Sequence, residues 1–351
     1  MLKQFTAVAL VAFSLATALA QTQSSTALTL EKAVQSALEA NTDIKTAENA
    51  LSLANRTLAA RNADPTALIT DLLQAKHSAE LSAAQLTGAK LDVTNEVIGE
   101  FLNLNEAKDS IAVLESQLKL VSRNLEIARA RLQARTATAV DVQRAETDVA
   151  GVQQQLSDAK AARPVTMARL ARVLGLARGS DIVIADAPAF KLRVLNIAEL
   201  EQNLEDRAPQ LVQASQAVEF AELNVKITDN DYTPEQQKRE AASNLENAKR
   251  ALATAKRKAL NTFRDAARSV AAAADSINVA KQNSTVAARN SKNDEERLKQ
   301  GLISRVQFEA TLLAQRQAEQ NQSRAENGYL RALAGLSLAA GVDVTGLVKS
   351  S

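Results

Sequence analysis

The sequence predicts an all-α protein built from two tandem repeats, each a long antiparallel coiled-coil hairpin. Two apolar rows recur every seven residues, the second three residues behind the first, which is the a/d pattern of a coiled coil. The rows are Leu104, Ile111, Leu118, Leu125 and Leu132, and Ala107, Leu114, Val121 and Ala128. Several residues are identical at positions 166 apart in the two halves, such as Arg131 and Arg297 or Gly175 and Gly341. Aromatic residues make up 3% of the chain, and Ala, Leu, Gln, Glu, Lys and Arg dominate, as in long helices.

The N-terminal residues have the features of a signal peptide. Lys3 is followed by the mostly apolar residues 5–16, and Ala18-Leu19-Ala20 forms an A-x-A cleavage site. We therefore expect residues 1–20 to be removed and the mature protein to be exported. The chain has no Cys, so neither a lipid anchor after cleavage nor a disulfide is expected.

The first repeat, residues 21–185, is expected to contain four helices. Thr29 is expected to be the N-cap of a helix to about residue 40, and a second helix follows over 42–62. After a turn at Asp64-Pro65, the long heptad helix extends to about residue 135. The chain reverses near 136–141 and returns towards Gly175, and Pro164 is expected to kink or interrupt this return helix because it lacks an N–H.

The second repeat, residues 186–351, follows an irregular stretch in which 182–184 is a candidate short strand. Its own long helix is expected over about 235–300. It carries a seven-residue row that is mostly alanine, which predicts a close approach between helices. The row comprises Leu245, Leu252, Ala259, Ala266, Ala273, Ala280 and Ala287.

The long helices predict lateral association. At 1.5 Å per residue, a helix of roughly 65 residues extends about 100 Å. Two hairpins of that length do not bury their apolar stripes in a compact monomer. A bundle or barrel of several copies is the expected consequence.

Charge and residue usage argue against several classes of protein. The net charge is +2 with acids and bases interspersed, so no nucleic-acid partner is expected. With one His and no Cys, the usual catalytic triads and zinc sites are not expected. We expect no enzyme activity, no cofactor and no metal. His77 is interpreted as a surface residue, and Asp294-Glu295-Glu296 as a solvated helix face.

Several motifs, taken in order, resemble the TolC family of outer membrane efflux proteins. The start, Leu28-Thr29-Leu30-Glu31-Lys32-Ala33-Val34, has a second copy in residues 203–211. Two reversals, residues 131–142 and 297–306, resemble the hairpin tips of the family. The closing segments Leu174-Gly175 and residues 336–341 also match.

The resemblance implies a homotrimer with a twelve-helix α-barrel, whose tips meet a periplasmic adaptor and an inner-membrane transporter. The tip residues that would contact the adaptor are Thr138, Asp141, Gly301 and Ser304. The family carries β-strand inserts near 61–67 and 228–236, where this chain has only short turns. Little or no β-barrel is therefore expected, with membrane association only indirect or through a partner.

The leading functional hypothesis is a TolC-like duct component for passive efflux or secretion across the periplasm. The protein would be exported and periplasmic or associated with the outer membrane. The alternative is a barrel-less coiled-coil scaffold that tethers or spaces the layers of the cell envelope.

Overall fold

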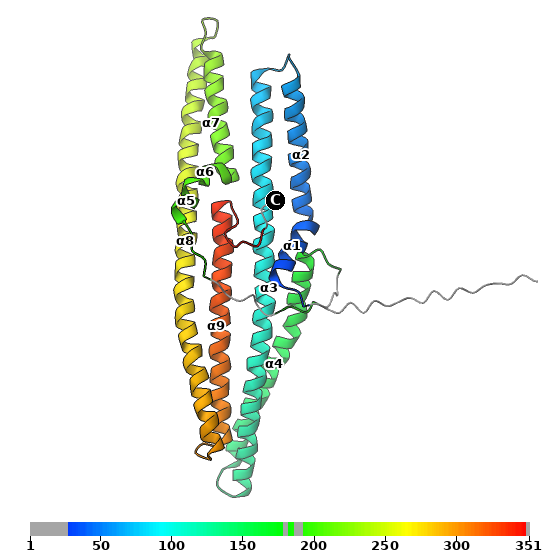
Figure 1. Ribbon diagram of the computed structural model, residues 1–351, viewed down its shortest axis with the longest axis vertical. Coiled ribbons are helices and arrows are strands. Elements are labelled where there is room, and N and C mark those ends of the chain that lie inside the picture. Colours follow the sequence, from blue (N-terminus) through cyan, green and yellow to red (C-terminus); the bar gives the residue numbers. More distant parts are fainter. Residues whose placement is uncertain (1–26, 178–181, 186–191, 349–351) are drawn as a thin grey trace, which may run out of the picture.

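The computed structural model describes residues 27–177, 182–185 and 192–348. The expected signal peptide, 1–20, and the start of the second repeat at 186 lie outside these residues. In each repeat the described short helices precede one long helix and one helix of intermediate length (Figure 1). They are α1 (Leu30–Ala40), α2 (Thr42–Ala63), α3 (Ile69–Gln133), α4 (Ala139–Val173), α5 (Ile197–Gln202), α6 (Leu204–Arg207), α7 (Pro209–Thr228), α8 (Glu235–Lys299) and α9 (Arg305–Ala340).

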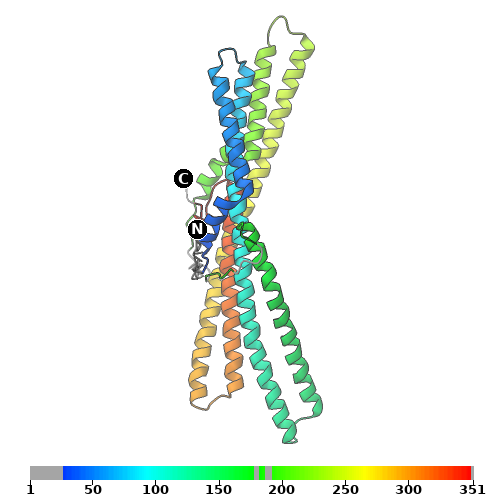
Figure 2. The same ribbon diagram turned by 90° about the vertical axis from the view of Figure 1, so that its right-hand side faces the viewer.

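The helices form an elongated, slightly splayed layer (Figures 1 and 2). Two reversals, 134–138 and 300–304, lie at one end, which we call the tip end. Two others, 64–68 and 229–234, lie at the opposite end, called the turn end. The order across the layer is α4–α3–α9–α8 towards the tip end and α2–α3–α7–α8 towards the turn end. The all-α fold of two long hairpins expected from the sequence is confirmed.

Each of α3 and α8 is 65 residues long and spans nearly the whole molecule, roughly 98 Å. Because α3 and α9 are the inner helices, they carry much of the contact between the two repeats. The outer helices α4 and α2 each leave one side without a neighbour in the described chain, as does α8 outside the stretch that contacts α5 and α6. Helix α4 continues through Pro164, which removes one backbone hydrogen bond but does not end the helix.

Two hydrophobic clusters lie in the middle of the layer. The first gathers residues of α1, α3 and α4 around Phe101, which is fully buried. The second gathers residues of α6 to α9 around Phe263, also fully buried. Helix α9 contributes to both, with Ala334 in the first cluster and Leu333 in the second. The two repeats therefore have separate cores that share one helix.

The side chains with which α8 packs against α9 become smaller towards the tip end. From Phe263 onward, the buried residues of α8 recur every seven positions, as a coiled-coil seam requires. They are Phe263, Val270, Ile277, Ser284 and Ser291. The alanine row expected from the sequence flanks this seam and is half-buried where it faces α9. Small residues on both sides let the helix axes approach closely, as expected.

Residues 182–184 differ from the expectation of a short strand. Ile184 makes a single isolated parallel bridge with Leu28. The backbone N–H of Leu28 donates to the carbonyl of Val183 at 2.7 Å, and the N–H of Ala185 donates to that of Leu28 at 2.9 Å. One pairing satisfies the backbone where the chain enters α1, but it does not extend into a strand.

Candidate functional site

The two tips have the same backbone geometry, residue for residue, at an offset of 166. At the first tip the N–H of Thr136 donates to the carbonyl of Arg131, and at the second the N–H of Leu302 donates to that of Arg297, both at 2.8 Å. These are the six-to-one bonds of a Schellman motif. The residues that close the two helices are both left-handed, Arg135 with φ 58° and Gly301 with φ 71°.

The next helix starts with a capping box at each tip. The Thr138 N–H donates to the Asp141 carboxylate at 2.8 Å, and the Asp141 N–H donates back to the Thr138 hydroxyl at 3.3 Å. The pKa of Asp141 is lowered first by the Thr138 N–H and then by the Thr138 hydroxyl, which both donate to its carboxylate at 2.8 Å. At the second tip Ser304 and Gln307 make the same reciprocal pair. Thr138 and Ser304 thus occupy equivalent N-cap positions, whereas Asp141 corresponds to Gln307 and Gly301 to Arg135.

A left-handed backbone predicts opposite effects of substitution at the two tips. Replacing Gly301 with alanine should lower the free energy of unfolding by about 1 kcal/mol, because a Cβ is disfavoured at positive φ. Replacing Arg135 with glycine should raise the free energy of unfolding, but by less than about 1 kcal/mol. The substitution removes the strain of a side chain at positive φ, and the larger conformational entropy of glycine in the unfolded chain offsets part of that gain. Urea denaturation of each variant measures both. A stabilising Gly301→Ala would contradict the expectation.

Apolar side chains protrude at the tips. Val140 is 63% exposed and Leu302 is 65% exposed, although each follows a helix end that is fully capped. Nearby, the Thr311 hydroxyl donates to Asp294 at 2.6 Å, and this bond, followed by Arg297, lowers the pKa of Asp294. Glu295 and Glu296 both pair with Lys299, consistent with the solvated helix face expected there. The tips are therefore rigidly capped and carry exposed apolar points.

A polar joint links the two repeats near the middle of the layer. Glu106 of α3 accepts from Arg331 at 2.7 Å and from Asn327 at 3.1 Å, both on α9. Arg331 also donates to Asn103 at 3.0 Å. One turn nearer the tip end, the Ser323 hydroxyl donates to Asp109 at 2.8 Å. These bonds fix the register of the second hairpin against the first.

A second polar contact joins α3 and α7 towards the turn end. The Nε2 atom of His77 lies 2.9 Å from the Glu219 carboxylate, and Gln216 donates to the backbone carbonyl of His77 at 2.9 Å. His77 is 9% exposed, so the expectation of a surface residue is wrong. Its side chain faces α7, a helix that the sequence alone does not place beside α3.

The pKa of Glu219 is lowered, first by the bond to His77 and then by the charges of His77 and Lys76. A carboxyl with a depressed pKa stabilises the fold above its unfolded pKa of about 4.3, and this contribution disappears as pH falls through the folded value. We expect the thermal midpoint to fall from about pH 5 downward. Glu219→Gln should flatten that fall, whereas Glu240→Gln on exposed α8 should not. Equal profiles for both variants would contradict this assignment.

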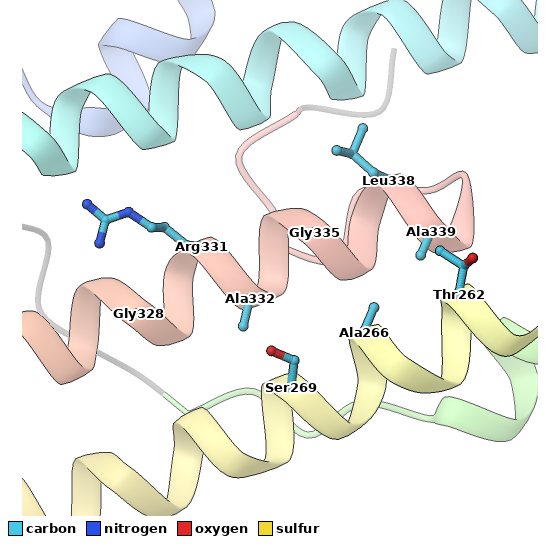
Figure 3. A pocket seen from close by; sticks show the side chains of 9 residues that line it. All are labelled: Thr262, Ala266, Ser269, Gly328, Arg331, Ala332, Gly335, Leu338 and Ala339. Carbon is cyan, nitrogen blue, oxygen red and sulfur yellow. The ribbon is translucent and has the colours of Figure 1, made fainter.

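A shallow groove runs between α8 and α9. One part of it is a hollow of about 520 Å³, which Figure 3 shows in detail. Ala266 and Ser269 of α8 face Ala332 of α9 across it, while Arg331 points away from α8 (Figure 3). The small side chains on both walls explain why two closely packed helices leave a groove. No group of His, Cys, Asp or Glu suited to a metal ion occurs among the described residues.

The described helices include none that combines the length and the apolarity needed to cross a membrane. The tips could be located from the sequence because the heptad pattern ends there. The polar joint could not, although polar residues next to Leu104, namely Asn105 and Glu106, were a signal that this face of α3 meets something other than an apolar seam.

The molecule has a double-hairpin helical fold. Residues 70–176 match the outer membrane efflux protein family. The TolC-like resemblance expected from the sequence is thereby confirmed. No curated protein matches the chain significantly in sequence.

Solved structures of outer-membrane proteins share the fold. The channel OprN matches at a TM-score of 0.64 and 15% identity, over 89% of this chain and 89% of that one. VceC from Vibrio cholerae matches at 0.62 and 14%, over 89% and 96%. CmeC from Campylobacter jejuni matches at 0.63 and 14%, over 89% and 85%. The likeness extends over nearly the whole chain, well beyond the segment that matches the family.

Proposed function

We propose that this chain is the protomer of a passive efflux or secretion duct that crosses the periplasm as a homotrimer. The observation that supports this most directly is the layer of four helices with open sides on α8 and on α2 and α4. Such a layer is complete only when neighbouring copies cover those sides. Energy for transport would come from an inner-membrane transporter, and the duct itself would perform no chemistry.

The capped tips are the proposed contact with a periplasmic adaptor. Thr138, Asp141, Gly301 and Ser304 hold the backbone, and Val140 and Leu302 offer the exposed apolar side chains. Apolar anchors on a rigid frame are typical of interaction sites. Export to the periplasm, with attachment to the outer membrane, is part of the same proposal.

The first experiment is the mass of residues 21–351 by light scattering without detergent. A trimer that shows a central opening in electron micrographs supports the duct. A monomer at all concentrations would contradict it and favour the alternative, a scaffold that spaces envelope layers.

The adaptor contact is tested separately in cells, by cross-linking and recovery of the tagged chain. Val140→Asp together with Leu302→Asp should abolish recovery of an adaptor while leaving the oligomer mass unchanged. Leu68→Asp is the matched control, since Leu68 is also 65% exposed but lies at the turn end. An effect of the control equal to that of the tip variant would overturn the assignment to the tips.

A further inference from the structure

The two tips share one backbone geometry but differ in charge. Residues 129–144 form the first tip and contain four bases against one acid. The bases are Arg129, Arg131, Arg135 and Arg144, and the acid is Asp141. The equivalent residues of the second tip, 295–310, contain three bases and three acids. Because both tips lie at the same end of the molecule, the positive charge is confined to one of two neighbouring reversals (Figure 1).

Three arginines of the first tip have no ion-pair partner. Arg131, Arg135 and Arg144 are exposed, and none of them pairs with a carboxylate in the described part of the chain. The Asp141 carboxylate accepts from Thr138 instead. At the second tip, by contrast, every base in the matching range has an acidic partner. The pairs are Arg297 with Asp294, Lys299 with Glu295 and Glu296, and Arg305 with Glu309.

Arg135 occupies a backbone position at which glycine is favoured. Its φ is 58°, and it is the one residue other than glycine with a positive φ among the residues that the structure describes. Gly301, its equivalent at the second tip, adopts the same conformation without a side chain that could be strained. A side chain held in the left-handed region costs stability, and such positions gather at functional sites. The turn itself does not need the arginine, so its side chain requires a role outside the turn.

The helix dipole explains only part of this charge. Bases near the C-terminus of a helix are stabilised by its dipole, which accounts for Arg131 at the end of α3. Arg144 lies in the second turn of α4, near the positive end of that helix, where the dipole does not stabilise a base. The C-terminus of α8 has the same dipole as that of α3, yet its bases are paired with acids of the same helix.

We propose that the first tip binds an acidic segment of a protein partner, whose carboxylates contact Arg131, Arg135 and Arg144. A guanidinium group can bind a carboxylate through two parallel hydrogen bonds, so a cluster of exposed arginines selects acidic side chains. Val140, which is 63% exposed in the same tip, offers an apolar contact beside them. The inference rests on the proposed adaptor contact and adds the chemistry of the partner and its restriction to one tip.

The distribution of charge favours a protein segment over a membrane surface. A flat anionic membrane would meet both tips, and the second tip, with three bases and three acids, would contribute no net attraction. A narrow acidic segment can engage the first tip alone. The unpaired charge is placed where such a segment would use all of it.

The test uses the photo-reactive residue p-benzoyl-phenylalanine in place of Val140, in cells that produce the full chain. The protein segment that it cross-links should contain several Asp or Glu residues. Arg131→Glu, Arg135→Glu and Arg144→Glu together should lower the yield of this cross-link by about tenfold or more, since like charges would then face each other. Replacing the acids of the captured segment with Lys should restore the yield with the triple variant.

The matched control reverses three bases at the turn end that are also exposed and without an ion pair in the described chain. They are Arg56→Glu, Lys226→Glu and Arg239→Glu. The net charge of the chain changes by the same amount. The yield at position 140 should stay within about twofold, because charges far beyond the Debye length are screened.

Arg135→Gly provides a variant that keeps the fold. It should raise the free energy of unfolding, because the strain at positive φ is removed. It should nevertheless lower the cross-link yield by about two- to fivefold, since one exposed ion pair to the partner is lost. Stability and binding then change in opposite directions, which a merely structural role of Arg135 would not produce.

The outcomes separate this inference from the proposed adaptor contact. A captured segment without acidic residues, or a yield that the triple variant leaves unchanged, would overturn the charge pairing and leave the adaptor contact intact. Failure to capture any protein from position 140 or from position 302 would overturn both. If the triple variant keeps its cross-link yield but no longer binds phosphatidylglycerol vesicles, the arginines bind anionic lipid, and the inference is wrong.

Discussion

Replacing Phe263 with alanine is expected to lower the free energy of unfolding by about 3–5 kcal/mol. Phe263 is fully buried at the centre of the second cluster, where α8 meets α9. Its neighbours on α8 include half-buried alanines, which have no rotamer freedom to fill the space left by the ring. The cavity should therefore persist, which places the cost in the upper part of that range. Urea denaturation followed by circular dichroism measures it.

The equivalent substitution in the first repeat provides an internal comparison. Phe101→Ala removes a ring of the same kind from the other cluster and should cost a similar amount. Because the clusters are separate, the two losses should add to within about 0.5 kcal/mol. Phe220→Ala is the control, since Phe220 is 44% exposed and should cost far less. A strongly non-additive double variant would mean that the repeats share one core.

Removing the Glu106 carboxylate is the second large effect, with an expected loss of about 2 kcal/mol. Glu106→Ala would leave Arg331 without its charged partner, and the amide of Asn327, which is 1% exposed, without an acceptor. The penalty comes mainly from that buried donor rather than from the ion pair, because the Arg331 side chain is 35% exposed and water screens its charge.

A double-mutant cycle with Arg331→Ala separates the two contributions. The coupling energy between Glu106 and Arg331 should be smaller than the cost of Glu106→Ala alone. When Glu106 is removed from the Arg331→Ala variant, the amide of Asn327 still loses its acceptor, and this cost is not part of the coupling. Glu115→Ala is the matched control, because Glu115 pairs with Lys160 at the surface and both side chains are 53% exposed. That control should cost less than about 1 kcal/mol. Equal costs for the two variants would contradict a special role of the joint.

Much of the fold could be predicted from local pattern. Thr29 was expected to cap the first helix, and its hydroxyl accepts from the Lys32 N–H. The second long helix was expected over about 235–300 and is observed over 235–299. Heptad spacing, caps and turns act within a few residues, so they can be read directly from the chain.

Contacts between the repeats could not be predicted in the same way. His77 appears next to Lys76 as an ordinary surface residue, and only the position of α7 buries it. Ser284 and Ser291 occupy the seam of α8, yet a search for apolar rows selected the flanking alanines. The helix that buries His77 lies more than a hundred residues away in the sequence. For the α8 seam, the local pattern does not determine which side of α8 faces α9.

The heptad seams also restrict how the length of this molecule can change. Inserting three or four residues into α3 would rotate everything beyond the insertion away from α4 and α9, whereas seven residues preserve the seam. The same seven residues would be needed in α4, α8 and α9, or the two tips would end at different heights. The length of the molecule can therefore change only in steps of roughly 10 Å, and each step must lengthen all four helices together. The distance between the two ends of the molecule is therefore fixed by the number of heptads in its long helices.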